Sequence, residues 1–333
     1  MSFSQSIPET ATETVANSDF ARALLQGLSA PEKSIPCRFL YDAAGSDLFE
    51  RITELPEYYP TRTEMGILRA CAGEIAADAA PGNVLIEFGS GSSTKTEILL
   101  AEMHKIHAYV PIDISKAALS DAYDRIRRRF PDLVVLPVCG DFARPLALPP
   151  EIARRPRLGF FPGSTIGNLA NDEAVALLSN MALILGTGAR LIIGADLKKD
   201  VDTLLRAYDD PAGITAAFNL NLLRRANREF GTKFDVGRFD HLATYDEEHG
   251  RVDLYLVSRI DQVVNVLGRR IHFAAGERIH TEHSHKYDIA GFQALAARAG
   301  WRALKVWTDP DKLFSVHVLE AEESTSPYQG ELR

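Results

Sequence analysis

Cysteine is scarce in this sequence, which has three cysteines among 333 residues: Cys37, Cys71 and Cys139. They are widely spaced and form no Cys-x-x-Cys pair, so the sequence indicates neither a disulfide framework nor a thiolate zinc site. We therefore expect the three side chains to be small apolar groups in the interior.

Long hydrophobic runs are also missing. The longest, such as residues 133–138, fall far short of the roughly 20 apolar residues that a bilayer-spanning helix needs. The polar N-terminus has no hydrophobic signal core. We therefore expect a cytoplasmic protein that does not enter a membrane.

An excess of positive charge is the third missing feature. The chain has 37 Lys and Arg residues against 45 Asp and Glu residues, for a net charge of −8. This is the wrong sign for a protein that grips phosphate backbones, so no nucleic-acid partner is expected. With 46% hydrophobic and 25% charged residues, the composition is that of a globular chain of one large or two moderate domains.

The sequence does contain a regular alternation of strand and helix patterns. Apolar runs typical of buried strands lie at residues 84–88, 108–112, 134–138, 158–161 and 190–195. Helical stretches separate them, and one of these has Asn171 or Asp172 as its candidate N-cap. A helix at 289–299 and strands at 303–307 and 314–319 complete the series. This rhythm predicts a parallel sheet covered by helices on both faces.

The alternation breaks between residues 198 and 285. A long helix is expected at 211–230, followed by strands at 251–258 and 262–267 that pair with each other around a turn at 259–261. We interpret this region as an insertion. The expected architecture is an α/β domain interrupted by a second domain, to which the N-terminal helices also belong.

A glycine-containing turn after the first strand marks a candidate nucleotide site. Gly89 and Gly91 allow tight bending and close approach of the backbone to a ligand. Taken alone, this pattern fits an NAD site, a methyl-donor site or an ordinary turn. Glu87 lies within the strand end, where S-adenosylmethionine enzymes commonly place an acid, and Thr94 replaces the third glycine of the dinucleotide pattern. These two features favour S-adenosylmethionine over NAD.

Further acids follow the next two strands. Asp113 ends the second strand, where its carboxylate can accept hydrogen bonds from both ribose hydroxyls. Asp141 and Phe142 follow the third strand and suit the exocyclic amine and the ring face of an adenine. Because the carboxyl ends of parallel strands meet at one edge, these residues are predicted to line one crevice. Lys95, at the start of a helix, either meets the carboxylate of an amino-acid-like cofactor or is a solvated helix lysine.

Several sequence blocks occur in a fixed order between about residue 30 and residue 320. They are YDAAGSDLF at 41–49, LPEYYPTR at 55–62, EFGSGSSTKT at 87–96, GDF at 140–142, GSTIGNL at 163–169, RAYDD at 206–210 and TEHS at 281–284. Together they resemble the histidine-specific, S-adenosylmethionine-dependent Nα-methyltransferases of ergothioneine biosynthesis. Such collinear blocks are far more specific than a single glycine turn.

The resemblance implies a Rossmann-like class I methyltransferase domain with a second, substrate-binding domain built from the N-terminal helices and the insertion. It implies trimethylation of the α-amino group of L-histidine to hercynine, with S-adenosyl-L-methionine as cofactor. The corresponding ranges are 18–62 and 198–286 for the substrate-binding domain, 63–197 and 287–322 for the methyltransferase domain, and 1–17 and 323–333 for flexible tails.

The resemblance also assigns individual residues. Together with the turn pattern, it gives as cofactor-binding residues Glu87, Gly89, Gly91, Lys95, Asp113, Asp141 and Phe142. Asn168 and Tyr208 would hold the amino-acid backbone of the substrate, and Tyr58 would help at its carboxylate. Glu282 and Ser284 would bind the imidazole. Leu254, a further expected substrate contact, stands where members of the family usually have methionine.

Methyl transfer requires a neutral amine held in line with the sulfonium. The Tyr41 hydroxyl or the Asn168 side-chain carbonyl can aim the nitrogen lone pair while water takes the proton, so these two are the predicted catalytic residues. Aromatic faces of Tyr41, Tyr58 and Phe49 can stabilise the growing quaternary ammonium.

The spacing of Glu282 and Ser284 supports imidazole binding, because residues two apart in an extended segment point to the same face. The carboxylate can accept from one ring N–H and the hydroxyl can serve the other nitrogen, which an indole lacks. A solvated edge-strand charge is the alternative for Glu282. His283 and His285 share the opposite face and could chelate zinc, but no cysteine or well-spaced acid accompanies them, so no metal is expected.

Other functions stay open at this point. The nearest alternative is methylation of another amino acid, such as tyrosine or tryptophan. Alternatives of a different class are a non-catalytic nucleoside-binding regulator and an NAD-linked oxidoreductase. The favoured interpretation is an enzyme that acts on L-histidine as a monomer.

Overall fold

The computed structural model describes residues 18–91 and 93–323. Within these ranges the chain forms two compact units. The large-sheet unit comprises Tyr59–Lys199 and the chain from His285 onward, and the insert unit comprises the chain up to Tyr58 together with Asp200–Ser284. The assignment of a substrate-binding and a methyltransferase domain, with boundaries at 62/63, 197/198 and 286/287, stays a prediction.

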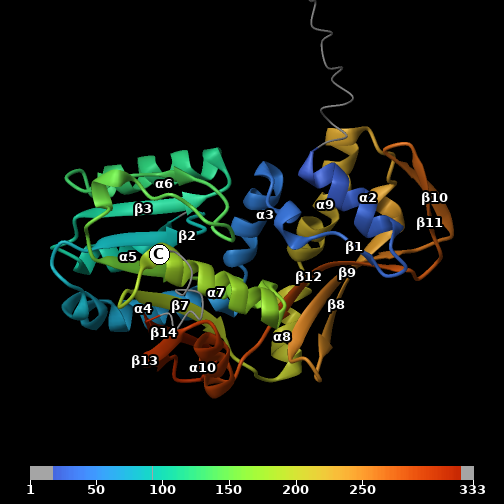
Figure 1. Cartoon of the computed structure of the whole chain (residues 1–333). Coiled ribbons are helices and arrows are strands. Elements are labelled where there is room, and N and C mark those ends of the chain that lie inside the picture. Colours follow the sequence, from blue (N-terminus) through green and yellow to red (C-terminus); the bar gives the residue numbers. More distant parts are fainter. Residues whose placement is uncertain (1–17, 92, 324–333) are drawn as a thin grey trace, which may run out of the picture. The chain divides into compact units, whose positions relative to one another are not determined.

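The large-sheet unit is built on an eight-stranded sheet in the order β13-β14-β7-β6-β2-β3-β4, with β5 also paired to β3 (Figure 1). The strands are β2 (Val84–Phe88), β3 (Ala108–Asp113), β4 (Val134–Val135), β5 (Val138–Cys139), β6 (Arg157–Phe161), β7 (Arg190–Asp196), β13 (Trp301–Thr308) and β14 (Phe314–Ala321). The pairs among β2 to β7 are parallel, which confirms the expected parallel sheet. β14 runs antiparallel to both β7 and β13. The pairing with β13 is antiparallel because a short turn, and not a crossover helix, joins these two strands.

Helices cover both faces of this sheet, as expected. Apolar residues of α4 (Tyr59–Asp78), α5 (Thr94–Glu102) and α6 (Lys116–Arg129) form one core with the sheet. Those of α7 (Asn171–Leu185) and α10 (Ile289–Arg298) form the other core. The short helices η2 (Pro150–Ile152) and η3 (Thr165–Asn168) lie in the connections after β5 and β6.

The start of α7 differs from the prediction. Ala170 is the N-cap, and Asn171 and Asp172 are already inside the helix. The Glu173 carboxylate accepts the Ala170 N–H at 3.0 Å. The third helical residue therefore supplies the capping hydrogen bond, and no polar side chain is needed at the cap itself.

The expectation of three interior cysteines is right for Cys71 only. Cys37 is half-buried, and Cys139 is exposed. Cys139 ends β5, a two-residue strand that pairs with β3 alone among the described residues, so one side of it stays open.

The insert unit contains two small sheets and the remaining helices. Its elements are α2 (Asp19–Ser29), β1 (Lys33–Ser34), η1 (Cys37–Leu40), α3 (Ala43–Thr53), α8 (Val201–Tyr208), α9 (Ile214–Phe230), η4 (Val236–Arg238), β8 (Phe239–Asp246), β9 (Arg251–Ser258), β10 (Gln262–Val266), β11 (Arg269–Phe273) and β12 (Arg278–His285). One sheet has the order β1-β12-β9-β8, and β10 and β11 form the other. α9 packs against α3, β8 and β9.

The predicted pairing between 251–258 and 262–267 is wrong, although both segments are strands. β9 pairs with β8, and β10 pairs with β11. Each pair is a hairpin with its own tight turn. In the turn after β10, Leu267 and Gly268 both have positive φ, of 51° and 85°, as the twist of a two-residue hairpin requires.

None of the helices in the described ranges has the length and apolar composition of a membrane span.

Candidate active site

The turn after β2 has the tight bend expected from its glycines. Gly89 has φ 74°, a left-handed conformation that side chains disfavour. A Cβ atom at Gly89 would lie 3.6 Å from the Phe142 ring, so that ring packs directly on the turn. Phe142 also contacts Phe88 and Phe161 edge-on, with ring centroids 5.9 and 5.8 Å apart. An aromatic face is thus fixed beside the backbone of the turn.

Glu87 lies beneath this turn and is 1% exposed. Its carboxylate accepts hydrogen bonds from the hydroxyls of Thr96, at 2.6 Å, and Tyr109. Burial raises the pKa of the Glu87 carboxyl to about 7, and these hydroxyls oppose the shift only in part. Because the carboxylate is already enclosed by side chains, we propose that Glu87 supports the turn from below and does not touch the cofactor.

The difference in unfolding free energy between the Glu87→Gln variant and the natural chain should shift in favour of the variant as the pH rises. The folded chain keeps a proton on Glu87 up to about pH 7, whereas the unfolded chain loses it near the ordinary value of about 4.3. Natural stability therefore falls as the pH rises through this window, and glutamine cannot ionise. Urea unfolding of both chains measures this difference. Between about pH 5 and about pH 8 it should move by roughly 2–3 kcal/mol in favour of the glutamine variant.

Glu102, the exposed last residue of α5, offers the matched control, since Glu102→Gln makes the same chemical change at a position that is not buried. A Glu87→Gln difference that does not vary with pH would mean that Glu87 is ionised throughout and that burial does not govern its titration.

Asp113 and Asp141 follow neighbouring strands, as predicted. Asp113 ends β3 and Cys139 of β5 pairs with it, so Asp141 follows the adjacent strand. One Asp113 oxygen accepts the Ser115 N–H at 2.8 Å, and the other lies 3.4 Å from the Gly91 nitrogen. Asp141 accepts the Ala143 N–H at 2.9 Å and is otherwise exposed. The structure thus brings Gly89, Gly91, Asp113, Asp141 and Phe142 to one edge of the sheet.

Lys95 is not a solvated helix lysine. Its ammonium lies 2.5 Å from a carboxylate oxygen of Glu64, and the Glu64 side chain is 1% exposed. The Gly163 N–H donates to the same carboxylate at 2.9 Å. A Cβ at Gly194 would lie 2.2 Å from Glu64, so β7 needs a glycine there to admit the acid.

Glu64 was missed by the sequence analysis. The only signal for it is an acid on the helix face that carries Ile67 and Leu68 toward the sheet, two positions after the block at 55–62. Its partners Lys95 and Gly163 are 31 and 99 residues away in the chain, so no local pattern reveals the cluster.

The insert unit gathers most of the predicted substrate residues. The Tyr208 hydroxyl lies 2.9 Å from the Ser284 hydroxyl, and both are buried. The Tyr58 ring packs edge-on against Tyr208 with centroids 6.1 Å apart. Glu282, two residues before Ser284 on β12, is 7% exposed. Because β12 lies between β1 and β9 in its sheet, the alternative of a solvated edge-strand charge is wrong.

Tyr41 sits at an aromatic cluster of the same unit. Its ring packs edge-on against Phe49 and Phe218, with centroids 5.4 Å away in both cases. Tyr41 as a whole residue is 38% exposed, yet burial of its hydroxyl and then the nearby acidic group of Glu282 keep the pKa of that hydroxyl well above its usual value. The hydroxyl therefore stays protonated. Phe218, on α9, was not singled out by the sequence analysis because a phenylalanine on the buried face of a helix carries no functional signal.

The last two predicted residues, Leu254 and Asn168, lie in different units. Leu254 is buried on β9, and its carbonyl accepts the Thr281 hydroxyl of β12 at 3.0 Å, so it lies on the strand next to Glu282. Asn168 ends η3 and is half-buried. Asn168 belongs to the large-sheet unit, whereas the other predicted substrate residues belong to the insert unit.

Comparison with known proteins shows similarity along almost the whole described chain. A family model for histidine-specific, SAM-dependent methyltransferases matches residues 20–321. The histidine N-alpha-methyltransferase of Mycolicibacterium smegmatis is 44% identical over 294 residues, or 87% of this chain and 91% of that protein. The enzyme of the same name from Mycobacterium tuberculosis is 41% identical over 293 residues, or 86% and 90%. Ergothioneine biosynthesis protein 1 of Neurospora crassa is 32% identical over 298 residues, which are 86% of this chain but 33% of that protein.

Proposed function

The chain belongs to the family of histidine-specific, S-adenosylmethionine-dependent methyltransferases, and on this premise we propose that it methylates the α-amino nitrogen of L-histidine. It is a methyltransferase, S-adenosylmethionine is its cofactor, and its large sheet is the Rossmann-like sheet of this enzyme class. Three successive transfers would give hercynine, the first step of ergothioneine biosynthesis. The structural observation that supports histidine is the buried set of Glu282, Ser284 and Tyr208.

The residues at the sheet edge fit S-adenosylmethionine. The cofactor supplies a sulfonium-bound methyl group for in-line displacement by nitrogen. Ser90 of the turn is buried and its hydroxyl has no hydrogen-bond partner within the described ranges, as expected of a group that meets a ligand. Asp113 would accept from the ribose hydroxyls, and Asp141 and Phe142 would hold the adenine. Gly89 and Gly91 would admit the cofactor close to the backbone.

The Lys95–Glu64 pair suits the amino-acid end of the cofactor. That end is a zwitterion, with a carboxylate and an ammonium close together. Lys95 can meet the carboxylate, and the Glu64 carboxylate can accept from the ammonium, so each charge finds an opposite partner.

In the insert unit, we assign recognition of the imidazole to Glu282 and Ser284. When Tyr208 donates to Ser284, the Ser284 hydroxyl can in turn donate to the unprotonated ring nitrogen. Glu282 then accepts the ring N–H. This arrangement selects a neutral imidazole, and an indole would leave one polar group unpaired at a cost of about 1–3 kcal/mol.

The remaining residues act on the amine. Asn168 and Tyr208 would hold the amino-acid backbone, with Tyr58 at the carboxylate. Because the Tyr41 hydroxyl stays protonated, it can orient the nitrogen by hydrogen bonding and is not a phenolate base. The proton lost at each round passes to water. The rings of Tyr41, Tyr58 and Phe49 would stabilise the quaternary ammonium of the product.

The test is an acceptor panel. The purified chain is incubated with S-adenosylmethionine and each of the twenty amino acids, and methylated products are measured by mass spectrometry. Histidine should be the best acceptor and should gain up to three methyl groups. Better turnover of tyrosine or tryptophan would overturn the substrate assignment. In a separate titration, the chain should bind S-adenosylhomocysteine tightly and should not bind NAD. Action as a cytoplasmic monomer without a nucleic-acid partner is a further proposal from composition.

A further inference from the structure

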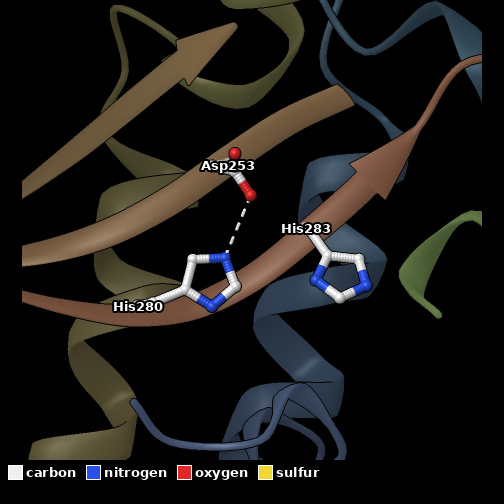
Figure 2. Close-up of side chains that lie close together, drawn as sticks. All are labelled: Asp253, His280 and His283. Atoms are coloured by element: carbon white, nitrogen blue, oxygen red, sulfur yellow. Dashed lines mark hydrogen bonds and ion pairs between the residues drawn. The ribbon is translucent and has the colours of Figure 1, made fainter. Parts of the chain in front are cut away.

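One cluster of potential metal ligands in the insert unit has no part in the proposed reaction. Asp253 of β9 and His280 and His283 of β12 place a carboxylate oxygen and two ring nitrogens within 4.8 Å of one another (Figure 2). The strands are neighbours in the four-stranded sheet. We propose that these three side chains bind one divalent transition-metal ion, and that Zn²⁺ is the best match.

The donor set supports this choice. Two imidazoles and one carboxylate form the ligand set of zinc sites that keep one position open for water. With bonds of about 2.0–2.1 Å, tetrahedral ligands stand about 3.3–3.4 Å apart. His280 Nε2 lies 3.0 Å from Asp253 Oδ1, close to that separation. The His283 ring lies alongside the His280 ring, with centroids 5.7 Å apart and planes at 25°, and one of its nitrogens lies within 4.8 Å of both other ligand atoms.

The surroundings hold two of the ligands in place. Asp253 is 3% exposed, and its second oxygen accepts from Arg251 Nε at 3.0 Å. The Tyr255 ring packs edge-on against His280 at 5.3 Å and fixes its orientation. Such supporting contacts are typical of metal ligands.

The sequence alone could not reveal this site. It drew attention to His283 and His285, but His285 Nδ1 lies 3.1 Å from the Gly167 carbonyl and is engaged there. The acid comes from a strand 27 residues before His280. The residues near Asp253 in the chain, such as Arg251 and Tyr255, form a pattern that is typical of any half-buried strand and gives no sign of a metal ligand.

An ion at this site would join β9 to β12 beside two substrate residues. Leu254 follows Asp253, and Glu282 precedes His283. The ion would therefore fix the strand segments that carry the imidazole contacts, without touching the substrate itself. Its occupancy can be measured with no cofactor or histidine present, so the test is independent of the methyl transfer.

The experiment titrates the chelator-treated full chain with Zn²⁺ alone. Free histidine is left out because it binds zinc itself. We expect one ion per chain by calorimetry, an increase in the thermal unfolding midpoint, and, with Co²⁺ as probe, the visible absorption of a tetrahedral site. Asp253→Asn and His283→Ala should each weaken Zn²⁺ binding by at least about tenfold.

The matched control is His249→Ala. His249 is exposed and has its own acid, with Nδ1 2.7 Å from Asp246 Oδ2, and the metal-ligand cluster does not include it. Its loss should leave affinity unchanged. His280→Asn, checked by circular dichroism for native folding, covers the case in which Asp253→Asn does not fold. No stoichiometric binding, or equal affinity in the natural chain and the His280 and His283 variants, would overturn the site.

Discussion

Replacing Glu282 with alanine should raise the Michaelis constant for histidine by roughly 10- to 100-fold, because a hydrogen bond to an ionised group is worth about 1.5–3 kcal/mol. Glu282 is 7% exposed on β12, so water does not replace the lost contact freely. Binding of S-adenosylhomocysteine should change little, since the cofactor residues lie in the other unit. Steady-state kinetics with varied histidine and calorimetry with S-adenosylhomocysteine measure the two quantities.

Glu248 provides the control, because it is an exposed glutamate of the same unit, in the turn between β8 and β9. Glu248→Ala should leave both constants unchanged. Glu282→Gln keeps the shape and one acceptor oxygen, so it should fall between the natural chain and the alanine variant. An unchanged Michaelis constant in Glu282→Ala would remove this residue from the substrate site.

The central strands of the large-sheet unit could be predicted closely because they are buried on both faces, whereas the predicted strand at 134–138 is divided into β4 and β5 at the partly exposed edge. β2 reads as an apolar run that only Glu87 interrupts, and its bounds match the predicted 84–88. The insert unit could not be predicted equally well. The segment 251–258 is a strand with the expected bounds, but its partner is β8 and not the next strand. Which strands pair depends on turn geometry and tertiary packing, and neither is encoded in the alternation within one strand.

The candidate site follows the same rule. Gly89, Asp113 and Asp141 could be predicted because each lies at or just after the end of a strand, and parallel strands end at a common edge. Glu64 and Asp253 could not, since each acts through residues far away in the chain. The gathering of Tyr208 and Ser284, 76 residues apart, was expected only through the family resemblance. Contacts between residues far apart in the chain are therefore the part of the site that the sequence pattern alone does not predict.

A buried ionic cluster in the large-sheet unit gives the second large prediction. Asp196, at the end of β7, is 1% exposed. Its carboxylate accepts from Lys199 at 2.6 Å, from Lys286 at 2.9 Å and from the Tyr59 hydroxyl at 2.7 Å. Burial lowers the pKa of Lys199 to about 8, and the charge of Asp196 limits that decrease. One buried carboxylate thus contacts two buried ammonium groups.

Asp196→Ala should destabilise the chain by about 3–5 kcal/mol, because it removes the buried carboxylate that contacts both ammonium groups. This is a large share of a typical stability of about 5–15 kcal/mol. Urea unfolding followed by circular dichroism should show a midpoint lower by roughly 1–2 M at neutral pH. The loss should be smaller at about pH 9, where Lys199 can give up its proton and the buried charge declines.

Two comparisons separate this effect from simple loss of a salt bridge. Lys199→Met leaves a one-to-one pair of Asp196 and Lys286, so it should change stability far less than Asp196→Ala does. Asp172→Ala breaks an exposed pair with Arg298 and should cost less than about 1 kcal/mol. If Lys199→Met proves as harmful as Asp196→Ala, the cluster is stabilised by the hydrogen bonds of Lys199 and not by the balance of charge. The order of the three variants therefore distinguishes the two causes.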